Sequence, residues 1–236
     1  MRSITIGTWN LRHGGGSRIN QILNIISENK NIDILVLTEF RNNQNKSIIE
    51  NELRKQNYQF IETLEVSSRL NSVLIASKTQ FDEVESFQSL DIHYQRILRV
   101  KAKGLNIYGC YFPGKNLKKE VFEFLISEIK NKGKENTIIT GDINTGKHFI
   151  DENGATFYHS DYLEKFEKLG LVDAWRKVNG EKREYTWFSN AGNGFRLDHF
   201  FIDENLSDKI VNCEYKHRYR EEKISDHSMM ILELTK

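Results

Sequence analysis

The stretch TGDINTG, residues 140–146, follows the apolar pair Ile138 and Ile139 and presents two polar side chains between glycines. Asp142 and Asn144 stand two positions apart, so in an extended chain they share one face. The flanking glycines would let a ligand approach the backbone closely. A polar reaction at the end of a buried strand explains this stretch as well as a tight turn does, because Asp, Asn and Gly are common turn residues. Other segments must decide between the two interpretations.

The composition is that of a globular protein. Of the 236 residues, 38% are hydrophobic and 28% are charged, which shows no bias toward disorder. No Pro-rich or Ser-rich linker divides the chain, so we expect a single domain over residues 1–236. The formal net charge of +1 gives no overall basic field. A nucleic acid or other phosphate partner would therefore be held by a local patch or by a metal.

The cysteines and the hydropathy pattern bear on the cellular setting. Cys110 and Cys213 lack the spacing of a metal site and are too few for a disulfide framework. No stretch approaches the roughly 18 apolar residues of a membrane span, and the amino terminus lacks an apolar signal core. We therefore expect a cytoplasmic protein with no membrane span, and we favour a monomer.

Apolar runs of strand length alternate with amphipathic helical patterns. The expected strands cover residues 4–9, 34–37, 73–77, 97–103, 105–110, 137–140, 197–202 and 229–234. The helical patterns lie around Ile19, Ile49, Val121 and Leu163, and each has one apolar face. The sequence therefore predicts an α+β domain in which helices flank a sheet.

Several expected strands end in polar side chains that could carry chemistry. The first strand leads into Asn10, and the second, which is continuously apolar, leads into Glu39. A carboxylate at such a place is costly unless it is paired, solvated or bound to metal. Tyr111 follows another strand, where its hydroxyl could donate to a phosphate oxygen or simply pack. Taken singly, each residue fits a turn, an exposed loop or the core equally well.

The carboxyl-terminal part offers a candidate pair of an acid and an imidazole. Asp198 stands inside an aromatic and aliphatic strand, where a carboxylate needs a partner. Asp226 and His227 precede the last apolar strand. A buried Asp facing an imidazole fixes its tautomer and raises its pKa. The remaining histidines are interpreted as structural: His13, His93, His148, His159, His199 and His217.

Residues 141–147 also read G-x-x-x-x-G-K, which is close to the phosphate-binding loop of nucleotide hydrolases. That loop continues with Ser or Thr as a magnesium ligand and with the start of a helix. Here His148 follows, and residues 149–157 are a poor helix. This alternative is therefore disfavoured.

The polar residues at the strand ends, in their order along the chain, resemble the endonuclease/exonuclease/phosphatase superfamily. The segments that carry the resemblance are TWNLRHG, LVLTEF, YFPG, GDINTG, GLVDAWR, YTWFS, FRLDHFF and SDHS, and they extend over essentially the whole chain. The sequence is most similar to the branch of exonuclease III and the apurinic/apyrimidinic endonucleases. Relatives of DNase I commonly have His where Tyr111 stands here.

The resemblance implies a DNase I-like, four-layer α/β/β/α sandwich of two packed mixed sheets flanked by helices. It also implies attack of water on a phosphodiester or phosphomonoester with a divalent metal as cofactor. Glu39 would be the principal ligand of Mg²⁺ or Mn²⁺, and Asp226 would hold or position a second ion. Tyr111 would contact phosphate or assist the leaving oxygen.

Further catalytic roles follow from the same resemblance. Asp142 would orient or deprotonate the attacking water, and Asn10 and Asn144 would steer water and phosphate. His227, braced by Asp198, would contact the phosphoryl oxygens. Whether Asp142 or His227 acts as the base stays open.

The implied substrate is DNA, cleaved at abasic sites or at 3′ ends. Trp187, Phe195 and Leu197 match the apolar pocket that accepts the flipped sugar in abasic-site enzymes, although such residues serve equally often as core. The basic residues that could line a rim for phosphate are Arg12, Arg41, Lys115, Lys147 and Arg196. One alternative is a hydrolase of small phosphoesters such as inositol or lipid phosphates. Another is a catalytically inactive binding module with the same fold.

Overall fold

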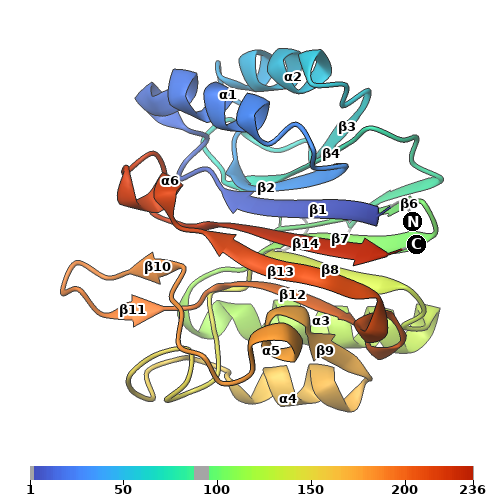
Figure 1. Cartoon of the computed structure of the whole chain (residues 1–236), viewed down its shortest axis with the longest axis vertical. Coiled ribbons are helices and arrows are strands. Elements are labelled where there is room, and N and C mark those ends of the chain that lie inside the picture. The colour runs from blue at the N-terminus through green and yellow to red at the C-terminus, as the bar shows by residue number, and fades with distance from the viewer. Residues whose placement is uncertain (1–2, 88–95, 236) are drawn as a thin grey trace.

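The computed structural model describes residues 3–87 and 96–235, and in these ranges it forms two six-stranded mixed sheets and a separate two-stranded hairpin (Figure 1). The first sheet has the order β13 (Ile210–Lys216), β14 (Met229–Thr235), β1 (Ser3–Asn10), β2 (Ile34–Phe40), β4 (Ser72–Ser77) and β3 (Phe60–Thr63). The second has the order β5 (Glu83–Ser86), β6 (Ile97–Ala102), β7 (Leu105–Tyr111), β8 (Thr137–Asp142), β12 (Asp198–Asp203) and β9 (Leu171–Asp173). The hairpin consists of β10 (Trp187–Phe188) and β11 (Gly194–Phe195).

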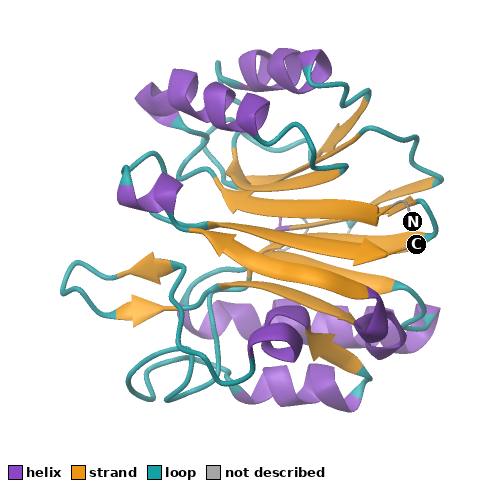
Figure 2. Cartoon of the chain, in the orientation of Figure 1, coloured by secondary structure: helices purple, strands orange, loops and turns teal. Residues whose placement is uncertain are grey.

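Helices cover the outer face of each sheet (Figures 1 and 2). Helices α1 (Ile19–Glu28) and α2 (Lys46–Lys55) lie on the first sheet, and α3 (Lys118–Lys132) and α4 (Asp161–Lys168) lie on the second. Two short helices, α5 (Ala174–Asn179) and α6 (Arg218–Glu221), connect strands. The predicted four-layer α/β/β/α sandwich is therefore confirmed. Within the described ranges, no helix combines the length and the hydrophobicity needed to cross a bilayer.

The central strands are apolar on both faces because each face is covered. In β2, Val36 packs between the two sheets, whereas Leu35 and Leu37 pack under α1 and α2. Burying each such side chain contributes roughly 1.5–3 kcal/mol. Where β7 packs on β2 of the other sheet, a Cβ on Gly109 would lie 2.9 Å from a methyl group of Val36. Glycine is therefore required there by the packing of one sheet on the other.

The sequence predicts the central elements and misses the edges. All eight expected strands are present, as β1, β2, β4, β6, β7, β8, β12 and β14, and the four helical patterns form α1 to α4. The missed strands β3, β5, β9 and β13 are at or next to a sheet edge, and the hairpin strands are two residues long. Partly exposed edge strands carry mixed polar residues, so they lack a continuous apolar run. His93, which we interpreted as structural, lies outside the described residues.

Candidate active site

The polar residues predicted at strand ends meet at one edge of the sandwich. Asn10, Tyr111 and Asp142 are the last residues of β1, β7 and β8. Asp142 pairs across the second sheet with Tyr111 on one side and with Asp198, the first residue of β12, on the other. The antiparallel direction of β12 relative to β8 brings its amino end to the edge where β8 ends. Strand direction and register therefore assemble the site from distant segments.

Asn10 joins the two sheets at this edge. Its side chain is fully buried, and Nδ2 donates to Oε1 of Glu39 at 3.2 Å and to Oδ2 of Asp142 at 3.0 Å. Its Oδ1 accepts a hydrogen bond from the backbone N–H of Arg12 at 2.8 Å. Glu39 of the first sheet and Asp142 of the second thus bond to the same side-chain amide, that of Asn10.

Glu39 has a strained backbone. Its φ of 49° lies in the left-handed region, and the register of β2 against β4 shifts between Thr38 and Phe40. A non-glycine residue in such a conformation costs on the order of 1–3 kcal/mol and is found mostly at functional positions. At the sheet edge, Oε2 of Glu39 accepts from the backbone N–H of His13 at 2.8 Å.

Asp142, His227 and Asp198 form a buried row. Nδ1 of His227 lies 2.8 Å from Oδ2 of Asp198, and Nε2 lies 3.9 Å from Oδ2 of Asp142. Burial raises the pKa of Asp142 to about 7 against the opposing effect of His227. Burial alone would lower the pKa of His227, but Asp198 and then Asp142 raise it to about 10. The imidazole is therefore held as the cationic partner of two carboxylates.

The turn after Asp142 is held by its own polar side chains. Asn144 has a φ of 55°, its backbone N–H donates to Oδ1 of Asp142 at 3.0 Å, and its Nδ2 donates to the carbonyl of Phe112 at 2.8 Å. The flanking glycines, Gly141 and Gly146, are needed because other parts of the protein pack closely against them. A Cβ on Gly141 would overlap the carbonyl oxygen of Cys110, and one on Gly146 would lie 2.6 Å from Cβ of Asp151. The expectation that these glycines admit a ligand is therefore wrong.

Tyr111 is held from both sides. Nδ2 of Asn71 donates to its hydroxyl at 3.3 Å, and the guanidinium of Arg96 lies 5.4 Å from the centre of its ring. Burial first, and then the charge of Glu39, raises the pKa of Tyr111 to about 12. The phenol therefore keeps its proton at neutral pH and can donate it in a hydrogen bond.

Two buried carboxylate oxygens in the site have no hydrogen-bond partner among the described residues: Oδ1 of Asp198 and Oδ1 of Asp226. The other oxygen of Asp226 accepts from the indole N–H of Trp187 at 3.4 Å and lies 3.9 Å from Nε of Arg12. Buried polar atoms without partners are uncommon in folded proteins and mark places where a ligand, water or ion is bound. Among the described residues, the four acids Glu39, Asp142, Asp198 and Asp226 have three basic side chains within 4.0 Å, Arg12, His13 and His227, so their negative charge is only partly compensated.

The predicted apolar residues lie beside the acids. The rings of Trp187 and Phe195 pack with centroids 5.8 Å apart, and Trp187 reaches the site through its bond to Asp226. Leu197 is buried, and its carbonyl accepts from the backbone N–H of Ile143 at 2.9 Å.

The expected basic rim is only partly present. The side chain of Arg12 is about half exposed, at 49%, and Arg41 donates to Oδ1 of Asn71 at 2.6 Å. Lys115 is exposed on the short 3-10 helix η3 (Lys115–Leu117). The other two residues expected in the rim, Lys147 and Arg196, pair with acidic side chains of the protein itself.

Arg196 is fully buried, so it cannot grip a phosphate at the surface. Its Nε lies 2.7 Å from Oδ1 of Asp151, and its Nη2 lies 2.5 Å from Oδ2 of Asp173. Lys147 pairs with Glu167 at 2.6 Å instead of facing the acids of the site.

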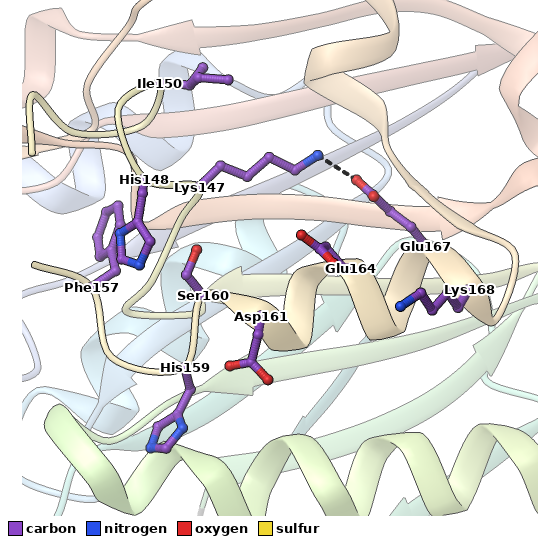
Figure 3. A pocket seen from close by; sticks show the side chains of 10 residues that line it. All are labelled: Lys147, His148, Ile150, Phe157, His159, Ser160, Asp161, Glu164, Glu167 and Lys168. Atoms are coloured by element: carbon purple, nitrogen blue, oxygen red, sulfur yellow. Dashed lines mark hydrogen bonds and ion pairs between the residues drawn. The ribbon is translucent and has the colours of Figure 1, made fainter. Parts of the chain in front are cut away.

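A cavity of 830 Å³ opens between α4 and the segment that follows the GDINTG turn (Figure 3). Its lining residues are Lys147, His148, Ile150, Phe157, His159, Ser160, Asp161, Glu164, Glu167 and Lys168. None of the clustered acids of the site borders it. Residues 148–150 form a turn and not a helix, which agrees with rejecting the nucleotide-binding loop.

Sequence reasoning missed several residues that support the site, among them Asn71, Arg96 and Ser225. The hydroxyl of Ser225 donates to the carbonyl of Asn10 at 2.6 Å and accepts from the backbone N–H of His227 at 3.1 Å. A signal existed for Ser225, which begins the SDHS segment, and for Asn71, which precedes the buried strand β4. Nothing in the sequence distinguishes Arg96 from an ordinary surface arginine.

Both the sequence and the fold are similar to those of known proteins. The sequence profile of the Endonuclease/Exonuclease/phosphatase family matches residues 7–227. A DNA-(apurinic or apyrimidinic site) endonuclease of Arabidopsis thaliana is 26% identical in an alignment 186 residues long, which covers 60% of this chain and 51% of that protein. The chain thus spans about half the length of this relative.

Solved structures share the fold. An AP endonuclease from Archaeoglobus fulgidus superposes with a TM-score of 0.83 at 22% identity, covering 97% of this chain and 98% of that one. The 3′ phosphatase NExo from Neisseria, bound to a product DNA hairpin, gives a TM-score of 0.82 at 22% identity, covering 99% of this chain and 100% of that one.

Proposed function

Because the chain belongs to the endonuclease/exonuclease/phosphatase family, we propose that it is a divalent-metal-dependent phosphodiesterase that hydrolyses DNA by in-line attack of water. One observation carries the proposal: Asn10 links Glu39 to Asp142, and Asp142 faces the imidazole of the His227–Asp198 pair. The DNA hairpin bound to NExo and the name of the Arabidopsis relative support DNA as the substrate.

The donor set fits a hard divalent cation such as Mg²⁺ or Mn²⁺, which prefers carboxylate oxygens. Asp142, Asp198 and His227 could hold an ion, since their ligand atoms lie within 4.8 Å of one another. Nδ1 of His227 is already bonded to Asp198, however, and Asp142 is assigned to the attacking water. By the resemblance to the family we assign the cation to Glu39, which Asn10 holds beside Asp142, with Asp226 and its unpartnered Oδ1 holding or positioning a second ion. The bound cation would supply Lewis-acid stabilisation of charge that develops on the phosphoryl oxygens.

The protein's own groups would orient and deprotonate the attacking water. Asp198 holds Nδ1 of His227 and thereby turns Nε2 toward Asp142. We assign the role of base to Asp142, and His227 would donate to the phosphoryl oxygens. The amides of Asn10 and Asn144, which both bond to Asp142, would fix its orientation.

Substrate contacts are proposed on both sides of these acids. Tyr111 would donate its hydroxyl to the phosphate or to the leaving oxygen. Arg12 and Arg41 would contact the DNA backbone. The apolar side chains Trp187, Phe195 and Leu197 would contact the sugar at an abasic site.

The test is incubation with Mg²⁺ and, separately, with Mn²⁺, on an abasic-site duplex, a plain duplex, a single strand and soluble phosphoesters. Metal-dependent cleavage of DNA that is lost in Asp142→Asn is expected. Cleavage of the soluble esters alone would contradict the nuclease assignment. Absence of turnover on every substrate would instead favour a binding module with this fold.

A further inference from the structure

Lys118, the first residue of α3, is buried at a place that is unfavourable for a cation. Only 3% of its surface is exposed, whereas lysines are almost never buried without a partner of opposite charge. No carboxylate of the described residues lies within 4.0 Å of its ammonium group. The amino end of a helix also carries the positive end of the helix dipole, which repels a cation. Folding stability alone does not account for a lysine here.

The ammonium group is directed at the turn that carries the proposed base. Nζ of Lys118 donates a hydrogen bond to the carbonyl oxygen of Asn144. Asn144 has the left-handed φ of 55°, and its backbone N–H and its side chain donate to the two oxygens of Asp142, at 3.0 and 3.3 Å. Lys118 is therefore connected through a single residue, Asn144, to the carboxylate of Asp142 that faces His227.

The charge of Lys118 is coupled to the same carboxylate. Burial lowers the pKa of Lys118 to about 8, and the charge that opposes this lowering is that of Asp142. The neighbour Lys119 is exposed and pairs with Glu123 at 3.7 Å, so it has no such contact with the site.

We propose that Lys118 is a positioning residue for the hydrolytic reaction: it fixes the carbonyl of Asn144 and thereby holds Asp142 in its reactive orientation. Its charge also balances part of the excess negative charge of the acids. This inference rests on the proposed phosphodiesterase function, in which Asp142 acts on water.

The kinetic test compares Lys118→Met and Lys118→Arg with the matched control Lys119→Met on the DNA substrate that the wild type cleaves best. We expect Lys118→Met to lower kcat about 10²-fold, with KM within about 3-fold and an unchanged or higher Tm, because a misplaced catalytic group costs about this factor. Lys118→Arg should recover at least about tenfold of the loss, and Lys119→Met should behave as wild type. A kcat within about 3-fold of wild type for Lys118→Met would overturn the proposal.

A second measurement does not depend on activity and separates this inference from the proposed function. The backbone N–H of Asn144 is bonded to Asp142, so its amide hydrogen exchange reports whether the turn is held. In Lys118→Met this exchange should rise at least about tenfold while that of β8 stays unchanged. Unchanged exchange at Asn144 would overturn the positioning role even if the wild type proved inactive on DNA.

Discussion

Two buried clusters of charged side chains lie in this protein, and they differ in how their charge is compensated. In one, Arg196 lies between Asp151 and Asp173, with the nearest atoms 2.7 and 2.5 Å apart. In the other, Asp142 and Asp198 share the imidazole of His227.

The pKa of a buried aspartate shifts in opposite directions in the two clusters. Burial would raise the pKa of Asp173, but Arg196 and then His199 hold it far below its usual range. Burial does raise the pKa of Asp142, to about 7, although the charge of His227 opposes the rise. A carboxylate with an arginine partner is inert and stabilises the fold, whereas one that stays under-compensated is available to a metal or a substrate.

The largest expected effect is on the hydrolysis rate, which should fall when an aspartate of the second cluster is replaced and not when one of the first is. Asp142→Asn should lower the rate of phosphodiester hydrolysis by about 10³-fold or more while the protein stays folded, because the proposed base is lost. The matched substitution Asp151→Asn should do the reverse, lowering Tm and leaving the activity per folded molecule near that of wild type. Steady-state rates and Tm of both variants measure this. Near-normal activity in Asp142→Asn would show that its assigned role is wrong.

The next effect tests stability in the compensated cluster. Arg196→Met should lower the free energy of unfolding by about 3–5 kcal/mol, because it leaves two buried carboxylates without their cation. Urea unfolding measures this, with Arg12→Met as the exposed control expected to change stability by less than about 0.5 kcal/mol. If Arg196→Met lost activity at full stability, Arg196 would belong to the site after all.

A smaller effect concerns the metal. Glu39→Gln should raise the Mg²⁺ concentration for half-maximal activity by at least about tenfold, because a neutral amide is a poorer ligand than a carboxylate. A metal titration of the rate measures the shift, with Glu62→Gln in β3 as the control. An unchanged titration curve in Glu39→Gln would exclude Glu39 as a principal ligand.

The smallest effect is a pH dependence of stability at Lys118. The pKa of Lys118 is about 8 in the folded state and about 10.4 in the unfolded chain, so between these values the unfolded chain binds more protons. The stability of wild type relative to Lys118→Met should therefore rise with pH in this window, by up to about 1.4 kcal/mol per pH unit. Denaturant unfolding of both proteins at pH 8 and pH 9.5 measures the difference. A constant difference would show that the folded protein does not depress this pKa.

The gathering of these acids was predictable because each of them interrupts or borders an apolar run. Glu39 near the end of β2 and Asp142 at the end of β8 stand out locally, and Asn10 links the two across the sheets. Arg196 was misjudged because its partners, Asp151 and Asp173, are 45 and 23 residues away along the chain. Such a partner has no local signal, so an arginine beside a strand looks the same whether it is exposed or buried.

The central strands were predictable for a similar reason, and the edges were not. Strand β13 alternates buried Cys213 and Tyr215 with polar residues that face solvent, so its apolar run is interrupted. Lys118 could not be identified either, because Lys115, Lys118 and Lys119 are chemically alike and only tertiary packing buries one of them.

The most direct test of an under-compensated, metal-binding site is anomalous X-ray scattering from crystals equilibrated with Mn²⁺. We predict a peak within coordination distance of the Glu39 carboxylate, on the side facing Asp142 and Asp226, and none at Asp151 or Asp173. A saturating Mn²⁺ concentration that supports hydrolysis but leaves no peak at Glu39 would contradict the account.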